Sequence, residues 1–192
     1  MNRLCVYCGS RLGVHDAYVE SARELASLLT ASDIALVYGG ADKGIMGVLA
    51  ESMLELGGEV IGVIPKALQE QEIAHRGLTE LHVVNSMHGR KSLMAVLADG
   101  FVALPGGFGT LEEIVEVLTW GQLNFHSKPC GLLNINGYFD SLIAFLANAE
   151  KEGFLRSEHR QMLQVANTPA QLLEQFEHYV APTVDKWSSE SR

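Results

Sequence analysis

The 192-residue sequence has no long apolar run, and none approaches the roughly 18 consecutive apolar residues that a membrane-spanning helix needs. Its first residues, Met1-Asn2-Arg3 before the strand-like Leu4–Tyr7, also lack the apolar length and small-residue cleavage site of a secretory signal peptide. These absences predict a cytoplasmic protein with no membrane partner.

Positive charge is scarce, because 14 Lys and Arg residues stand against 23 Asp and Glu residues, for a formal net charge of −9. Such a balance opposes non-specific binding to nucleic-acid polymers and anionic membranes. A small anion can still be held by backbone N–H groups and a few basic side chains. The composition therefore favours a small-molecule ligand.

Cysteine is also rare, and the odd count of three (Cys5, Cys8 and Cys130) offers no disulfide framework. Cys5 and Cys8 have C-x-x-C spacing, but they fall in an apparent strand, where residues three apart point to opposite faces. We therefore expect neither a redox pair nor a metal site from this motif.

What the sequence does contain is 47% hydrophobic residues in an alternation of short apolar runs and amphipathic segments. A chain of this length suits one globular domain, which we place at residues 1–180, before a polar tail at 181–192 that we expect to be disordered. Alternating strands and helices predict an α/β fold with a doubly wound, mostly parallel sheet. The six predicted strands are residues 4–8, 34–38, 59–64, 81–85, 101–104 and 130–135.

The stretch Pro105–Glu113 follows the apolar run Phe101–Leu104 and opens an apolar-periodic helix. Gly106, Gly107 and Gly109 let backbone N–H groups converge there without side chains in the way, and the helix dipole adds positive potential. The pattern favours a bound anion, above all a phosphate. The alternative is a tight turn with no ligand.

Two interpretations are open for the start of this helix. With Thr110 as the N-cap, Glu113 falls at N3 and completes a Thr-x-x-Glu capping box, which is a structural use of the carboxylate. In the other interpretation Glu113 lies beside the part of the ligand that is next to the phosphate.

In a parallel α/β sheet, ligands bind at the carboxyl ends of the strands. We expect four segments to gather at that edge: Gly9-Ser10, Gly39–Gly47, Met87–Lys91 and Pro105–Thr110. Arg90 and Lys91 are unexpected at the beginning of a helix, because the dipole favours acidic residues there. They indicate either an anionic partner or a solvated pair of surface charges.

Four motifs together resemble the LOG ("lonely guy") family of cytokinin riboside 5′-monophosphate phosphoribohydrolases, often labelled lysine decarboxylase-like. The resemblance covers roughly residues 4–180. The motifs are Cys8-Gly9-Ser10, Tyr38-Gly39-Gly40 with Gly44-x-Met46-Gly47, Met87-His88-x-Arg90-Lys91 and Pro105-Gly106-Gly107-x-Gly109-Thr110-x-x-Glu113.

The resemblance implies a Rossmann-like homodimer that cleaves the N-glycosidic bond of a purine nucleoside 5′-monophosphate, either AMP or a cytokinin-type nucleotide. The products are the free base and ribose 5-phosphate, and no metal or organic cofactor takes part. The resemblance assigns catalytic roles to Arg90 and Glu113. The implied substrate-binding positions are Ser10, Gly39, Gly40, Gly44, Met46, Gly47, Glu72, Lys91, Gly106, Gly107, Phe108, Gly109, Thr110, Leu111, Glu112 and Thr119.

Two residues depart from the family pattern. Ala41 stands where many members have a third glycine, and Arg11 stands where a second serine is frequent. Both leave the core motifs intact. We also expect the apolar residues Trp120, Leu123 and Phe125, near the end of the helix that follows the glycines, to lie close to the dimer contact.

Glycosidic cleavage passes through an oxocarbenium-like ribosyl cation, which a carboxylate such as Glu113 can stabilise while it orients or deprotonates water. Arg90 could hold the phosphate or ribose hydroxyls, or stabilise the departing base. The alternative function is a nucleotide or cofactor carrier of the same fold. Arg90 and Glu113 together favour the enzyme, because a carrier has no use for a carboxylate at the sugar.

Overall fold

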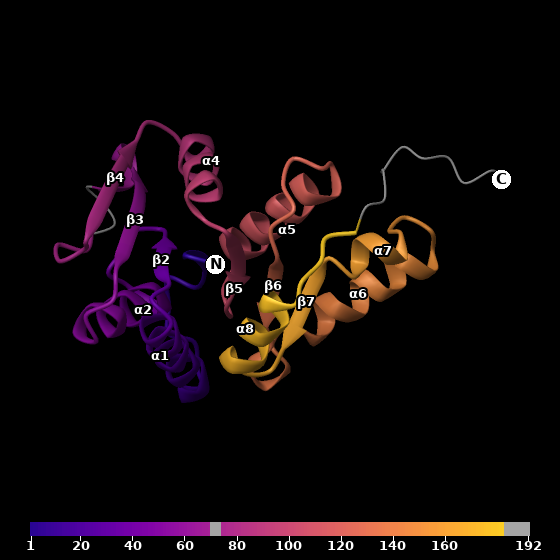
Figure 1. Ribbon diagram of the computed structural model, residues 1–192, viewed down its shortest axis with the longest axis horizontal. Coiled ribbons are helices and arrows are strands. Elements are labelled where there is room, and N and C mark those ends of the chain that lie inside the picture. The colour runs from indigo at the N-terminus through magenta and orange to yellow at the C-terminus, as the bar shows by residue number, and fades with distance from the viewer. Residues whose placement is uncertain (70–73, 183–192) are drawn as a thin grey trace.

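The computed structural model of the protein describes residues 1–69 and 74–182. One seven-stranded sheet lies at its centre, with the strand order β4-β3-β2-β1-β5-β6-β7 (Figure 1). Every pair of neighbouring strands is parallel. The strands are β1 (Arg3–Tyr7), β2 (Ala35–Tyr38), β3 (Val60–Pro65), β4 (Glu80–Val84), β5 (Gly100–Ala103), β6 (Cys130–Leu133) and β7 (Leu163–Ala166).

The doubly wound parallel sheet is confirmed, and each of the six predicted strands is present within two residues of its predicted ends. The prediction of six strands is wrong by one, because β7 was missed. This strand has only four residues, includes the polar Gln164 and lies half-buried at the edge of the sheet. A strand that short shows no clear alternation of apolar and polar residues.

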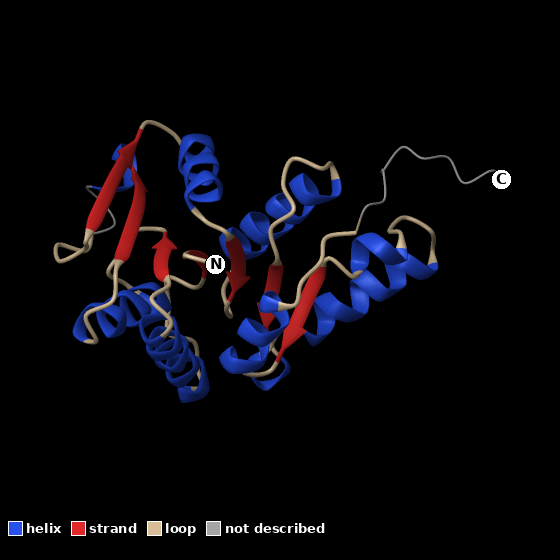
Figure 2. Cartoon of the chain, viewed as in Figure 1, coloured by secondary structure: helices blue, strands red, loops and turns tan. Residues whose placement is uncertain are grey.

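Helices cover both faces of the sheet (Figure 2). Helices α1, α2 and α8 pack in one core cluster, and residues of α4, α5 and α6 pack in the other. The helices are α1 (Asp16–Ala31), α2 (Gly44–Glu55), α3 (Lys66–Gln69), α4 (Met87–Leu97), α5 (Phe108–Gln122), the 3-10 turn η1 (Ile135–Gly137), α6 (Asp140–Lys151), α7 (Ser157–Arg160) and α8 (Pro169–Glu177).

The core confirms the expected placement of the C-x-x-C thiols. Cys5 packs in the cluster beneath α4 and α5, whereas Cys8 packs in the cluster beneath α1 and α2. Both thiols are buried and unbonded, and burial raises their pKa values well above the ordinary range. Two thiols on opposite faces of a strand cannot form a pair without rearranging β1.

Helix beginnings follow the capping rules in two places. The Thr168 hydroxyl accepts a hydrogen bond from the Gln171 N–H at the start of α8, with Pro169 in the first turn. At the start of α4, the Ser86 hydroxyl accepts from the Gly89 N–H. Such caps satisfy N–H groups that have no acceptor inside the helix.

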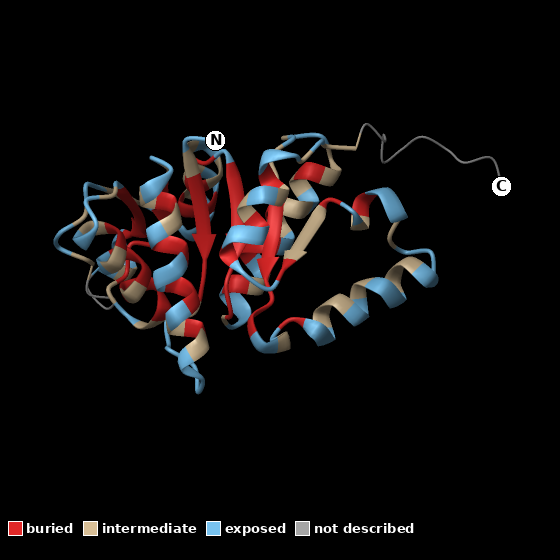
Figure 3. Ribbon diagram, turned by 60° about the horizontal axis from the view of Figure 1, so that its bottom comes forward, coloured by how far each residue is buried: buried red, intermediate tan, exposed pale blue. Residues whose placement is uncertain are grey.

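Helix α6 is unusual because none of its 12 residues is buried (Figure 3). Among the described residues, no helix combines the length and apolarity required to cross a bilayer. The predicted tail 181–192 falls almost wholly outside the described residues, so the boundary at residue 180 stays a prediction.

Candidate active site

The segments predicted to gather at the carboxyl edge of the sheet do so. The Gly9 N–H after β1 donates to the Pro105 carbonyl after β5 at 3.1 Å. The Ile45 N–H, from the turn after β2, donates to the Gly9 carbonyl at 3.1 Å. These bonds join three strand-to-helix turns at the point where strand order reverses, between β1 and β5.

The fourth segment, at the start of α4, reaches the same place through Arg90. A Cβ atom at Gly39 would collide with Nη2 of Arg90 and would lie 3.2 Å from Sδ of Met46. Only glycine therefore leaves room for the guanidinium over the end of β2. Gly40 continues the turn that begins at Gly39, and Gly44 and Gly47 lie in the first turn of α2.

The predicted capping box at the glycine turn is wrong. Helix α5 begins at Phe108, with Gly107 in an extended conformation (φ −93°, ψ −151°) as its N-cap and no side-chain capping bond. Thr110 is therefore a buried residue of the first turn, and its side chain packs directly beneath Gly106. Glu113 is therefore the sixth residue of α5, three positions beyond the N3 position predicted for it, where no orphan N–H group requires its carboxylate.

This early start leaves the N–H groups of the first turn of α5 without acceptors inside the helix, directly behind Gly106-Gly107. The Tyr138 hydroxyl donates to the Gly106 carbonyl at 2.6 Å and holds that oxygen. Ser10, Gly106 and Gly107 line a cavity of about 340 Å³ together with Arg11 and Tyr138. The turn thus combines N–H donors with adjacent open space, as an anion site requires.

Arg90 of α4 and Glu113 of α5 face each other in the buried space between the two helices. Arg90 Nη2 lies 3.8 Å from Glu113 Oε1, and the side chains are only 9% and 11% exposed. The interpretation of Arg90 and Lys91 as a solvated surface pair is therefore wrong, because both are buried. In the described part of the chain, Nε of Arg90 has no hydrogen-bond partner.

Burial raises the pKa of Glu113 to about 7, against an opposing effect of the nearby Arg90 charge. The neighbouring Glu112 raises it further, and Lys91 lowers it. At neutral pH this carboxyl group exchanges readily between its protonated and ionised forms, which is the condition that favours acid–base catalysis.

Lys91 occupies a different environment from Arg90. Its ammonium group hydrogen-bonds to Oε1 of Glu112 and, at 3.1 Å, to Oε1 of Glu116, both on α5. Hydrogen bonding to Glu112 raises the pKa of Lys91, despite its burial. Glu112, a predicted substrate-binding residue, is thereby paired with Lys91.

The remaining predicted site residues are distributed unevenly. The Phe108 side chain is 93% exposed beside the turn, and Leu111 packs against the core beneath α5. Thr119 lies nine residues beyond Thr110 on α5, roughly 13 Å along the helix, and its hydroxyl donates to the Val115 carbonyl. Thr119 therefore does not lie at the glycine turn of its own chain. Glu72 lies outside the described residues.

Two residues at the site escaped the sequence analysis. Glu116 joins the Lys91 cluster, and its spacing of four from Glu112 on a predicted helix was a usable signal. Tyr138 comes from the segment after β6, and nothing in its local sequence indicates that it reaches Gly106.

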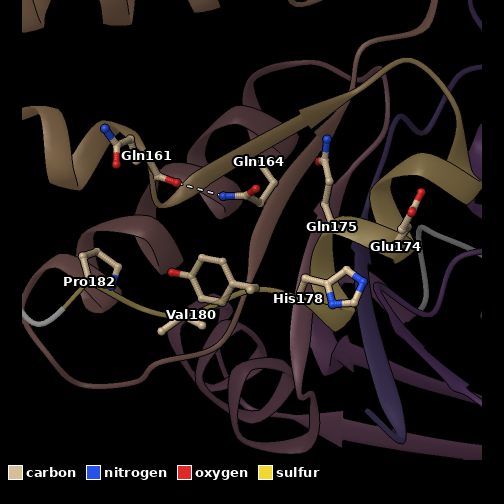
Figure 4. A pocket seen from close by; sticks show the side chains of 8 residues that line it. Gln161, Gln164, Glu174, Gln175, His178, Val180 and Pro182 are labelled. Carbon is tan, nitrogen blue, oxygen red and sulfur yellow. Dashed lines mark hydrogen bonds between the residues drawn. The ribbon is translucent and has the colours of Figure 1, made fainter.

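A second cavity lies at the edge of the sheet beside β7 and α8, with a volume of about 460 Å³ (Figure 4). Its lining is rich in amide side chains, and the Gln164 side chain donates to the Gln161 carbonyl at 2.8 Å. It contains no predicted site residue. We therefore take the buried Arg90–Glu113 pair between α4 and α5, together with the glycine turn, as the candidate active site.

Comparison of the sequence with known proteins identifies relatives of this chain. A family model described as "Possible lysine decarboxylase" matches residues 46–176. A probable cytokinin riboside 5′-monophosphate phosphoribohydrolase of Oryza sativa subsp. japonica is 46% identical over 92% of this chain and 72% of its own. A cytokinin riboside 5′-monophosphate phosphoribohydrolase of Arabidopsis thaliana is 45% identical over 93% of this chain and 84% of its own.

Solved structures resemble the chain in fold. The molybdenum cofactor binding protein of Rippkaea orientalis superposes with a TM-score of 0.69 at 20% identity, over 92% of this chain and 96% of its own. The molybdenum cofactor carrier protein of Chlamydomonas reinhardtii gives 0.70 at 20% identity, over 93% and 99%. At this level of identity the likeness shows the fold alone.

The packing at the glycine turn predicts that two adjacent glycines differ in their tolerance of alanine. A Cβ at Gly106 would collide with the Thr110 hydroxyl and lie 2.8 Å from the Thr110 Cβ, whereas a Cβ at Gly107 would meet nothing within 4 Å. Gly106→Ala should lower the free energy of unfolding by about 1–3 kcal/mol, and Gly107→Ala should change it by less than about 0.5 kcal/mol. Urea denaturation measures both, and equal stabilities would contradict this account of the turn.

Proposed function

Because the chain belongs to the LOG family of cytokinin riboside 5′-monophosphate phosphoribohydrolases, we propose that it hydrolyses the N-glycosidic bond of a purine nucleoside 5′-monophosphate. The products are the free base and ribose 5-phosphate, and AMP and N6-prenylated AMP are the proposed substrates. The observation that carries the proposal is the buried Arg90–Glu113 pair next to an unobstructed glycine turn at a helix start.

The glycine turn is the proposed binding site for the 5′-phosphate. Its N–H groups and the positive end of the α5 dipole attract an anion, as other helix starts do. A phosphate held there fixes one end of the sugar, so that binding energy far from the reacting bond positions the anomeric carbon.

Glu113 is the proposed catalytic carboxylate. Its ionised form stabilises the ribosyl cation and orients or deprotonates the attacking water. A pKa of about 7 suits a base at neutral pH, whereas an ordinary exposed glutamate would be a weaker base. The Arg90 guanidinium, whose Nε has no hydrogen-bond partner among the described residues, could stabilise the departing base or hold the substrate.

The family description as a possible lysine decarboxylase does not fit the chemistry of Lys91. Decarboxylation through pyridoxal phosphate requires a lysine amine that can form a Schiff base. The Lys91 ammonium is held by two carboxylates that favour its protonated form, so it is a poor nucleophile.

We predict that AMP and an N6-isopentenyl analogue will release free base and ribose 5-phosphate without added metal. The unphosphorylated nucleosides should react poorly, because the phosphate provides the anchor at the glycine turn. Chromatography of the released base measures the rate. Equal turnover of nucleosides and nucleotides would contradict the anchoring role, and tight binding of AMP without any release of base would favour a carrier.

Substitution of Glu113 tests its proposed chemistry directly, because the residue is not part of a capping box. Glutamine keeps the volume of the side chain but cannot carry the negative charge, and no helix cap depends on this residue. Glu113→Gln should keep its fold and its affinity for AMP and lose roughly 10²–10⁴-fold in the rate of base release. Arg90→Ala should lose both activity and some affinity. Retention of most of the rate by Glu113→Gln would remove the proposed chemistry from this site.

A homodimer is the proposed assembly, and the face formed by α6 and the end of α5 is the proposed contact. Phe145 on α6 is 65% exposed, and Phe125 after α5 is 75% exposed. Helix α6 also carries other apolar residues. Leu142 and Ile143 of α6 pack against the core, but no residue of this helix is buried. An exposed aromatic side chain on such a helix is typical of a surface covered by another subunit. Thr119 of α5 lines a cavity of its own chain together with Leu142 and Leu146 of α6.

We predict a mass in solution of twice 20.9 kDa by light scattering at micromolar concentration. Phe145→Glu should shift this mass toward the monomer, because it places a charge in the proposed contact. The matched control is Val83→Glu, a half-exposed apolar residue on β4 at the opposite edge of the sheet, which should leave the mass unchanged. A monomeric parent protein would show the assembly proposal to be wrong.

The proposed compartment is the cytoplasm. All three cysteines are unbonded and buried, which suits a reducing environment.

A further inference from the structure

We propose that Lys91 is a positioning residue and not a ligand of the nucleotide: through Glu112 and Glu116 it holds α5 against α4, and so sets the orientation and charge environment of Glu113. This inference rests on the proposed function of Glu113. The resemblance of the sequence to the LOG family implies instead that Lys91 contacts the substrate directly.

The contacts of Lys91 support a role within the protein. The side chain is 8% exposed, and two of its three N–H donors are engaged by carboxylates. Glu112 and Glu116 are four residues apart and therefore lie on one face of α5. A buried lysine held by two carboxylates has little positive charge left to offer a phosphate.

The position of Lys91 in the chain explains how it acts on Glu113. Arg90 and Lys91 are consecutive on α4, and each faces α5: Arg90 faces Glu113, and Lys91 faces the residues that flank it. Because the Arg90 and Lys91 contacts leave α4 in different directions, together they fix the rotation of α5 about its axis. The Lys91 cluster thus keeps Glu113 directed toward Arg90.

The charges around Glu113 are closely balanced. Arg90 and Lys91 face it from α4, and Glu112 and Glu116 face it from α5. Cys5 and Tyr7 of β1 and the following Cys8 are also close, but burial keeps these groups neutral. Loss of the Lys91 charge would leave Arg90 as the one cation among the three remaining charged neighbours in this group, so the ionised form of Glu113 would become less favourable. Loss of Glu116 would act in the opposite direction.

The experiment measures the protonation of Glu113 and the affinity for AMP separately, in the full-length protein. Carbon-13 NMR of glutamate-labelled protein follows the Glu113 carboxyl during a pH titration, with Glu113→Gln to assign its signal. Calorimetry at pH 8 measures AMP binding. Neither measurement requires turnover, so failure of the proposed hydrolysis would not be confused with failure of this inference.

Two substitutions should move the titration in opposite directions. In Lys91→Met, which keeps the apolar stem, Glu113 should titrate about one pH unit higher than in the parent protein. In Glu116→Gln it should titrate lower. In both variants the affinity for AMP should change less than about threefold, since neither side chain is proposed to touch the nucleotide.

An unchanged or lower titration midpoint in Lys91→Met would overturn the inference. So would a tenfold or greater loss of AMP affinity in that variant, which would make Lys91 a phosphate ligand. If Lys91→Met fails to fold because two carboxylates are left unpaired, the triple variant Lys91→Met/Glu112→Gln/Glu116→Gln removes all three charges together. That variant should bind AMP within about threefold of the parent protein, and a tenfold loss would again overturn the inference.

Discussion

The structure depends most on the cost of burying charge between α4 and α5. An isolated ion in a protein interior loses several kcal/mol of hydration energy, so buried charges persist only where they are paired or neutralised. Here Arg90 and Lys91 enter the interior together, and α5 supplies carboxylates to meet them. The two clusters are unequal: Lys91 donates hydrogen bonds to two carboxylates, whereas Arg90 and Glu113 stand 3.8 Å apart with a guanidinium donor unused. The incompletely satisfied pair is the reactive one in the proposed mechanism.

The sheet provides the frame for this arrangement. Because all seven strands are parallel, every strand-to-helix turn leaves the same edge, and the reversal of strand order between β1 and β5 opens a crevice there. The Gly9–Pro105 and Gly9–Ile45 backbone bonds fix the turns to one another. Glycine at 39 and at 106 then allows the Arg90 guanidinium and the Thr110 side chain to approach the backbone closely. Backbone hydrogen bonds and close packing thus set the geometry, and the ion pairs act within it.

The corrections have physical causes. Thr110 was assigned as an N-cap because Thr-x-x-Glu is a local pattern, but an extended Gly107 begins the helix three residues earlier and directs Thr110 inward. Strand β7 was missed because its partner β6 lies 30 residues earlier and a four-residue edge strand has no pattern of its own. Arg90 and Lys91 could be read as surface charges because their carboxylate partners lie more than 20 residues away, on another helix.

The sequence by itself determined the alternation of strands and helices, the parallel sheet, the glycine turns and the segments that meet at the carboxyl edge. These features follow from local periodicity, from glycine content and from the handedness of β-α-β connections. Only the tertiary structure decided which side chains are buried together: that Glu113 faces Arg90 and serves no helix cap, that Lys91 is held by Glu112 and Glu116, that Tyr138 binds Gly106, and that no residue of α6 is buried. The reason is that burial and long-range pairing depend on the rotation of one helix against another, and no spacing within a single segment specifies that rotation.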